Sequence, residues 1–219
     1  MLRHVLVEIW SDVVCPWCYL GKRRFEAALA RFEHAGEVEV RWRSFELDPT
    51  APERRETGMA AHLAEKYQMP LAEAEGRLRQ LDELAAGEGL PYDLAATKGG
   101  STYRAHQLIH LAYASSAELG AATKEALLRA YFLELRPIGD LATLLEVAVG
   151  VGIDPDEAAV ALAEERFGPA VRADEQEAAA LGCSGVPFFV LDRALAVSGA
   201  QSPDTFAAAL HEAWARRGG

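Results

Sequence analysis

The sequence places two cysteines, Cys15 and Cys18, on either side of Pro16 and Trp17. The pair lies between a predicted strand and a predicted helix. With Cys15 as the N-cap and Pro16 at the first helical position, the Cys15 sulfur lies among unpaired amide donors, which favour a thiolate and lower its pKa. Cys18, one turn later, lies on the same side and can close a disulfide. The spacing therefore predicts thiol–disulfide exchange, with Cys15 as nucleophile and Cys18 as resolving thiol.

Other interpretations of the pair fit the sequence less well. Two cysteines are half of a zinc site, but tetrahedral zinc usually takes a second pair of ligands, and Cys183 stands alone. His106 and His110 have the spacing of zinc ligands on one helix, but without a third ligand nearby, packing or surface placement explains them better. A purely structural disulfide is rare in a cytosolic chain, and inert thiols do not explain the position between strand and helix. We therefore expect no metal.

A second signal lies near the end of the chain, where Pro187 opens an apolar run that ends at Leu191. Proline removes a backbone donor, so it belongs at the start or the edge of a strand. The Val186–Pro187 bond is either an ordinary trans bond or a cis bond in a tight turn, and the residues alone leave both open. Cys183, four residues earlier, could act as a third redox thiol, but we favour the buried apolar role that cysteine often has.

The first fifth of the chain follows a β-α-β pattern. Residues 5–10 are mostly apolar and β-favouring, which predicts a buried strand. From Pro16, apolar residues recur at helical spacing and predict a helix, which Gly36 ends. Residues 38–43 then alternate between apolar and charged side chains, as in a strand with one solvated face.

The middle of the chain changes character and predicts helices. It is rich in alanine, leucine and glutamate and holds almost no β-branched runs. One apolar helical stripe runs from Leu127 to Leu135. Asp154 is predicted as an N-cap, with Pro155 at the first helical position. Gly182 closes the last helix of this region.

The end of the chain returns to strands, at residues 186–191 and 194–197, and a final helix starts at Ser202. Neither end has enough strands to form a sheet alone, so we infer that they share one sheet. The sequence therefore predicts an α/β order, β-α-β … β-β-α, with a large helical insertion. The predicted parts are a domain of residues 1–49 and 183–219, a bridging helix at 169–182 and an inserted helical subdomain at 50–168.

The composition excludes several classes of protein. The 219 residues carry 22 basic and 33 acidic side chains, a formal net charge of −11, and half of them are hydrophobic. This is not the composition of a disordered chain, and the negative charge argues against nucleic acid or an anionic membrane as a partner. The first apolar stretch, which Glu8 interrupts, is too short for a signal sequence, and no apolar run reaches membrane length. We therefore expect a soluble, cytoplasmic protein of undetermined oligomeric state.

Taken together, these features resemble a thioredoxin fold with a helical insertion, and the motifs resemble the DsbA family, in particular its FrnE-like branch. The matching segments run nearly from end to end of the chain, which makes the resemblance specific. They are 11–24 (SDVVCPWCYLGKRR), 41–47 (RWRSFEL), 105–110 (AHQLIH), 184–190 (SGVPFFV) and 197–201 (VSGAQ).

The resemblance implies a protein dithiol–disulfide oxidoreductase. Cys15 would be the exposed nucleophile, and Cys18 would resolve the mixed disulfide. Members of such families carry acidic groups that assist proton transfer, and Glu8 and Asp12 are the candidates for that role here. The implied partners are protein thiols and disulfides or small thiols.

The resemblance also implies how a substrate is held. Pro187 matches the family's cis-proline, which faces the dithiol, and the backbone of Val186 would pair with an extended substrate segment. Pro16 and Trp17 complete the predicted substrate-binding set, and we expect Trp17 to be partly exposed.

Kinship extends to the group of 2-hydroxychromene-2-carboxylate isomerases and kappa-class glutathione transferases. Members of that group commonly carry serine at the position of Cys15 and activate glutathione, so the two cysteines favour redox exchange here and leave glutathione open as a co-substrate. A glutathione-dependent isomerase or transferase is the first alternative function. A redox-switched, chaperone-like binding module is the second. No tightly bound cofactor is implied beyond the redox-active Cys15–Cys18 disulfide.

Overall fold

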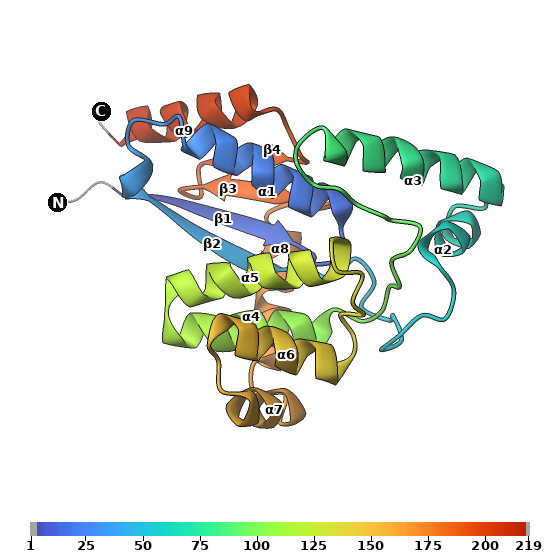
Figure 1. The fold of residues 1–219 in the computed structure, drawn as a ribbon. Coiled ribbons are helices and arrows are strands. Elements are labelled where there is room, and N and C mark those ends of the chain that lie inside the picture. The colour runs from blue at the N-terminus through green and yellow to red at the C-terminus, as the bar shows by residue number, and fades with distance from the viewer. Residues whose placement is uncertain (1–3, 218–219) are drawn as a thin grey trace. The chain divides into compact units, whose positions relative to one another are not determined.

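Strands from both ends of the chain form a single sheet in the computed structural model, which describes residues 4–217. The strands are β1 (Val5–Ser11), β2 (Val38–Ser44), β3 (Phe188–Leu191) and β4 (Leu195–Ser198), in the order β2-β1-β3-β4. β1 runs parallel to β2 and antiparallel to β3, and β3 is antiparallel to β4 (Figure 1). The inference that the two ends share one sheet is therefore correct.

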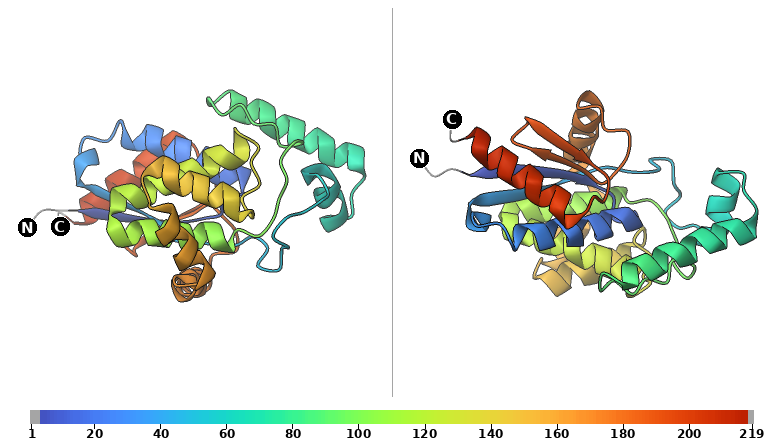
Figure 2. Two further views of the ribbon diagram at one scale, coloured as in Figure 1. Left: turned by 60° about the horizontal axis from the view of Figure 1, so that its bottom comes forward. Right: turned by 90° about the horizontal axis from the view of Figure 1, so that it is seen from above.

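The sheet is covered on both faces because its residues alternate in direction. On one face, Phe189 packs against Phe25 of α1 (Pro16–Leu29) and Phe206 of α9 (Pro203–Arg216), with ring centroids 5.6 and 4.5 Å away. Figure 2 shows α1 and α9 side by side over this face.

On the other face of the sheet, the buried side chains of Trp10, Phe188 and Val190 pack with Ala178 of α8 (Gly168–Ala180). α8 ends close to where the sequence predicts, because Gly182 takes a left-handed conformation, with φ of +76°, which glycine adopts at low cost. α1 ends at Leu29 and not, as the sequence predicts, at Gly36; Gly36 lies instead in a short 3-10 helix, η1 (Ala35–Glu37), before β2.

The chain divides into two units, one made of Met1–Leu47 with Val171–Gly219 and the other of Asp48–Ala170. The first holds the sheet with α1, α9 and nearly all of α8. Residues 1–3 and 218–219, which the sequence assigns to the same domain as the sheet, lie outside the described residues.

The second unit is helical, as the composition of the middle of the chain predicts. Asp154 caps its helix by accepting hydrogen bonds from the N–H groups of Asp156 and Glu157, which confirms the predicted helix start. Leu135 departs from the predicted stripe: α5 ends at Phe132, and Leu135 is exposed with a φ of +56°. The helices of this unit are α2 (Met59–Lys66), α3 (Leu71–Ala86), α4 (Tyr103–Ser115), α5 (Ala117–Phe132), α6 (Leu141–Val151) and α7 (Pro155–Ala163).

None of the helices described between residues 4 and 217 combines the length and the apolar character that crossing a membrane requires.

Candidate functional site

Cys15 is the N-cap of α1, and Pro16 occupies the first turn, as the sequence predicts. The backbone of Cys15 is extended, with φ of −88° and ψ of 115°, and its carbonyl accepts the N–H of Cys18 at 3.0 Å. Both cysteines, like Cys183, are free thiols in this structure. The local sequence thus places two thiols on the first turn of one helix, where a disulfide between them can form and open.

The Cys15 sulfur is covered, which corrects the expectation of an exposed nucleophile. Cys15 is 4 % exposed, and its Sγ donates a hydrogen bond to the carbonyl oxygen of Val186 at 3.7 Å. Cys18 is fully buried, whereas Trp17 between them is 44 % exposed, as predicted. The Cys15 sulfur therefore lies against the backbone of the segment that precedes β3, and the exposed indole ring of Trp17 follows two residues later in the chain.

Pro187 packs directly on α1. The Val186–Pro187 peptide bond is cis, and a Cβ atom at Gly21 would lie 2.9 Å from Cγ of Pro187. Glycine is required here because a methyl group would push against the proline ring. The carbonyl of Pro187 accepts the N–H of Gly199 at 2.8 Å. The sequence thus brings Pro187 against the helix that carries the dithiol.

The pKa of the Cys15 thiol is raised well above its ordinary value, opposite to the direction that the helix N-terminus predicts. The hydrogen bond with the Cys18 side chain is the largest cause, followed by burial and by negative charge on Cys18 and Asp12; the backbone N–H of Cys18 acts in the lowering direction. The hydrogen bond and the charge of the Cys18 side chain both make it harder to ionise Cys15 when Cys18 is already a thiolate. One thiolate shared by neighbouring sulfurs is therefore the ionised state that this geometry supports.

Asp12 ties the cysteine loop to the end of β2. Its buried carboxylate accepts the N–H of Val13 at 2.7 Å through Oδ1 and the N–H of Leu47 at 2.8 Å through Oδ2. The Asp12 carbonyl accepts the N–H of Cys15 at 3.4 Å. These contacts give Asp12 a structural role in the loop, and its charge also reaches Cys15.

Glu8 lies in β1 and is held by two guanidinium groups. Its buried carboxylate accepts Nε of Arg43 at 2.9 Å and Nη2 of Arg193 at 2.8 Å. Arg43 continues the network to Asp174 of α8 at 3.0 Å. The arrangement joins β1, β2, α8 and the turn between β3 and β4 across one face of the sheet. These ion pairs occupy the carboxylate that the sequence offers as a proton-transfer group.

Glu46 is a buried carboxylate that sequence reasoning missed. Its Oε1 accepts Nη1 of Arg172 at 2.6 Å, whereas Oε2 has no hydrogen-bond partner among residues 4–217. Burial raises the pKa of Glu46 to about 7, against the lowering effect of Arg172, and the charges of Glu175 and Asp12 add to the rise. A glutamate between Phe45 and Leu47 at the end of a predicted strand was the available signal.

Cys183 lies partly buried beside the same segment. Its Sγ donates to the carbonyl of Gly185 at 3.3 Å, and its side chain packs against the cluster that contains Trp10 and Phe188. Burial raises the pKa of its thiol, and the charge of Cys18 adds to the rise. This packing agrees with the apolar role favoured from the sequence.

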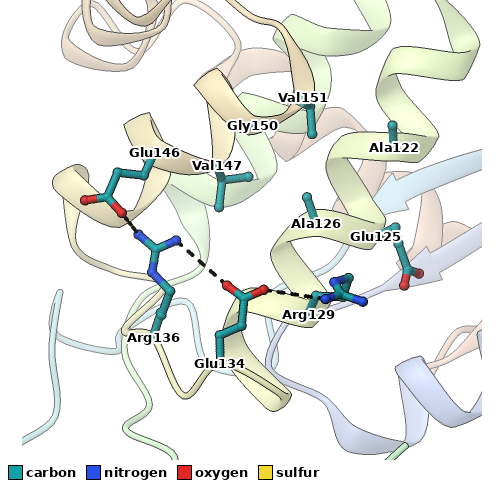
Figure 3. Close-up of a pocket in the computed structure, with 10 residues that line it drawn as sticks. All are labelled: Ala122, Glu125, Ala126, Arg129, Glu134, Arg136, Glu146, Val147, Gly150 and Val151. Carbon is teal, nitrogen blue, oxygen red and sulfur yellow. Dashed lines mark hydrogen bonds and ion pairs between the residues drawn. The ribbon is translucent and has the colours of Figure 1, made fainter. Parts of the chain in front are cut away.

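The helical unit holds a pocket of its own, lined by α5, α6 and the loop between them (Figure 3). Its ion pairs join Arg129 and Arg136 to Glu134, and Arg136 also to Glu146. No cysteine or histidine lines it, and no group of three or more potential metal-ligating side chains occurs in residues 4–217. The pocket therefore offers ion-paired side chains and the carboxylate of Glu125, but no thiol or imidazole.

Comparison with known proteins finds a family model and solved structures that match most of the chain. The model of the DSBA-like thioredoxin domain family matches residues 6–211. The structure of a probable DsbA oxidoreductase from Streptomyces coelicolor is 46 % identical in sequence, with a TM-score of 0.91 over 97 % of this chain and 91 % of that one.

Two more distant structures share the fold. The cytosolic disulfide reductase DsbM of Pseudomonas aeruginosa, solved with GSH, is 24 % identical, with a TM-score of 0.63 over 94 % of this chain and 98 % of its own. A 2-hydroxychromene-2-carboxylate isomerase is 16 % identical, with a TM-score of 0.65 over 97 % of this chain and 98 % of its own. These likenesses confirm the α/β thioredoxin fold predicted from the sequence.

Proposed function

We propose a reaction for the dithiol on the premise that this chain belongs to the family of DsbA-like thiol–disulfide oxidoreductases, whose DSBA-like thioredoxin domain spans residues 6–211. Within that family, we assign Cys15 as the nucleophile and Cys18 as the resolving thiol of a redox-active pair. The observation that carries the assignment is the position of the Cys15 sulfur, at the N-cap of α1 and 3.7 Å from the Val186 carbonyl.

The exchange proceeds in two displacements. The Cys15 thiolate attacks one sulfur of a substrate disulfide, forms a mixed disulfide and releases the other substrate sulfur as a thiolate. The Cys18 thiolate then attacks the Cys15 sulfur, so the Cys15–Cys18 disulfide forms and the second substrate thiol leaves. The substrate gains two electrons and two protons, which the dithiol loses. The reverse sequence oxidises a substrate dithiol, and the reduction potential against that of the compartment decides the direction.

The substrate is an extended polypeptide segment in this proposal. The N–H of Val186 donates no hydrogen bond within residues 4–217, so it can pair with the backbone of a bound segment. Trp17 offers an exposed apolar ring two residues after Cys15. Pro16 follows Cys15 directly, and Pro187 follows Val186, whose carbonyl contacts the Cys15 sulfur. Such backbone pairing gives affinity with little choice of sequence, which suits a general protein disulfide oxidoreductase.

We also propose that the protein acts in the cytoplasm, as a FrnE-like member of the family, without a tightly bound cofactor. Cytosolic thiols are kept mostly reduced, so reduction of substrate disulfides is the favoured direction there. Glutathione would then serve as the co-substrate that reduces the Cys15–Cys18 disulfide.

The test is the reduction of insulin by dithiothreitol, followed by turbidity. The wild-type protein should accelerate the reaction, Cys15→Ser should abolish the acceleration, and Cys183→Ser should retain it. A wild-type protein without effect would overturn the proposal. Turnover of 2-hydroxychromene-2-carboxylate with glutathione would favour the isomerase instead, and suppression of aggregation that survives loss of both Cys15 and Cys18 would favour the binding module.

A further inference from the structure

Glu46 contacts none of the reacting atoms in this structure, yet its surroundings connect it to the dithiol. Its side chain is 1 % exposed, and one carboxylate oxygen has no hydrogen-bond partner among the described residues. Burying a carboxylate with an unsatisfied oxygen disfavours its charged form. Glu46 is therefore a group whose charge can change at low cost near neutral pH.

The charged groups around Glu46 come from two directions. From α8, Arg172 donates to Oε1 of Glu46 at 2.6 Å and to Oε2 of Glu175 at 2.7 Å, so one guanidinium is shared by two carboxylates. Glu175 also accepts the backbone N–H of Glu46 at 3.2 Å. From the cysteine loop, the charge of Asp12 acts on Glu46. Negative groups thus outnumber the positive one in this cluster.

Asp12 links this cluster to the nucleophile. It accepts the N–H of Leu47, the residue after Glu46, and its backbone carbonyl accepts the N–H of Cys15. The charge of Asp12 acts on both Glu46 and the Cys15 thiol. A proton gained or lost at Glu46 therefore changes the negative charge immediately beside the residue that holds the Cys15 loop.

We propose that Glu46 is a positioning residue of the dithiol site, which sets how readily Cys15 forms a thiolate by holding or releasing a proton beside Asp12. With Glu46 neutral, Asp12 is the nearby negative charge and the thiolate forms more easily. With Glu46 ionised, a second carboxylate opposes the thiolate. Ionisation of Glu46 therefore makes the reactivity of Cys15 rise less steeply with pH through neutrality. The inference rests on the proposed function because it concerns the same dithiol.

The test compares Glu46→Gln with the wild-type protein, full-length and reduced, by the rate of Cys15 alkylation with iodoacetamide. Cys15 and Cys18 lie in one peptide, so fragment-ion mass spectrometry of that peptide is used to assign the label to the Cys15 sulfur. This readout works whether or not the protein exchanges disulfides with a substrate. The ratio of variant to wild-type rates should be close to one at pH 5.5 and should rise through pH 7 to about threefold at pH 8.5, from the loss of one nearby charge.

Two further variants separate this role from a structural one. Glu177→Gln removes an acid of the same helix that pairs with Arg193, and its ratio should stay near one at every pH. Arg172→Gln removes the cation from Glu46 and should move the titration of Glu46 to higher pH. This variant also keeps the proposal testable where Glu46→Gln does not fold. A ratio for Glu46→Gln that is the same at every pH, or an equal rise in Glu177→Gln, would overturn the proposal.

Discussion

The Sγ atom of Cys15 lies 3.7 Å from the carbonyl oxygen of Val186, although 171 positions separate the two residues. The contact follows from the sheet. β1 leads into the loop of Cys15, β3 begins just after Pro187, and the two strands pair antiparallel with Trp10 opposite Phe188. The end of one strand therefore meets the start of the other at the same edge. Strand pairing thus brings together the Cys15 sulfur, the proposed nucleophile, and the backbone of Val186, which is proposed to hold a substrate.

Gly21 controls this arrangement through its contact with Pro187. In Gly21→Ala, the new methyl group would lie 2.9 Å from Cγ of Pro187 and 3.4 Å from Cβ of Ala200. We expect overpacking to cost about 1–3 kcal/mol of unfolding free energy. We also expect insulin reduction to slow by roughly tenfold, because the 186–187 segment shifts from the dithiol.

The matched control for that prediction is Gly36→Ala, since nothing lies within 4 Å of a Cβ at Gly36. Urea unfolding and insulin reduction should both remain near wild-type values in this variant. Equal activity of Gly21→Ala and Gly36→Ala would show that the Pro187 contact does not position the site.

Glu8 is expected to stabilise the fold and not to transfer protons. Glu8→Gln leaves Arg43 and Arg193 without their buried carboxylate, but both arginines are partly exposed. Water can therefore solvate the two guanidinium groups in the variant. We expect the free energy of unfolding, measured in urea, to fall by about 1–3 kcal/mol. The pH profile of insulin reduction should keep its shape. Loss of an ionisation from that profile would instead assign Glu8 to proton transfer.

Glu46 should make the fold less stable as pH rises through neutrality. Its pKa is about 7 in the folded protein, above its ordinary value, so the folded state holds this proton more tightly than the unfolded state does. The stabilisation is complete below the ordinary carboxyl range and is lost progressively as pH rises from there through about 7. Relative to Glu46→Gln, the wild-type protein should lose roughly 1–2 kcal/mol between pH 5 and pH 8 in urea unfolding. A difference independent of pH would contradict the titration of Glu46.

Local signals were enough to predict the order of the elements and the thiol pair, although α1 ends at Leu29 and not at Gly36. Pro16 after Cys15 fixes a helix start, and the strand before it follows from its run of apolar residues, so the N-cap position of Cys15 could be read directly. The shared sheet followed from counting strands at the two ends. These predictions succeed because capping and strand patterning depend on neighbours in the sequence.

Burial and charge at the site depend on residues far apart in the chain, and there the sequence was a poorer guide. Cys15 is covered by Val186, which reverses its predicted exposure. Its pKa rises because burial and Cys18 outweigh the helix amides. The ion pairs of Glu8 with Arg43 and Arg193 could not be predicted from the sequence either. Such effects require the partner across the sheet to be known.

The assignment of Cys15 as the nucleophile is measured by trapping a mixed disulfide in Cys18→Ala. This variant is incubated with a peptide that carries one internal disulfide, and the adduct is mapped by mass spectrometry. We expect a persistent mass increase of one peptide at Cys15, none at Cys183, and no lasting adduct in the wild-type protein because Cys18 resolves it. An adduct at Cys183, or none at Cys15, would contradict the assignment of Cys15 as the nucleophile.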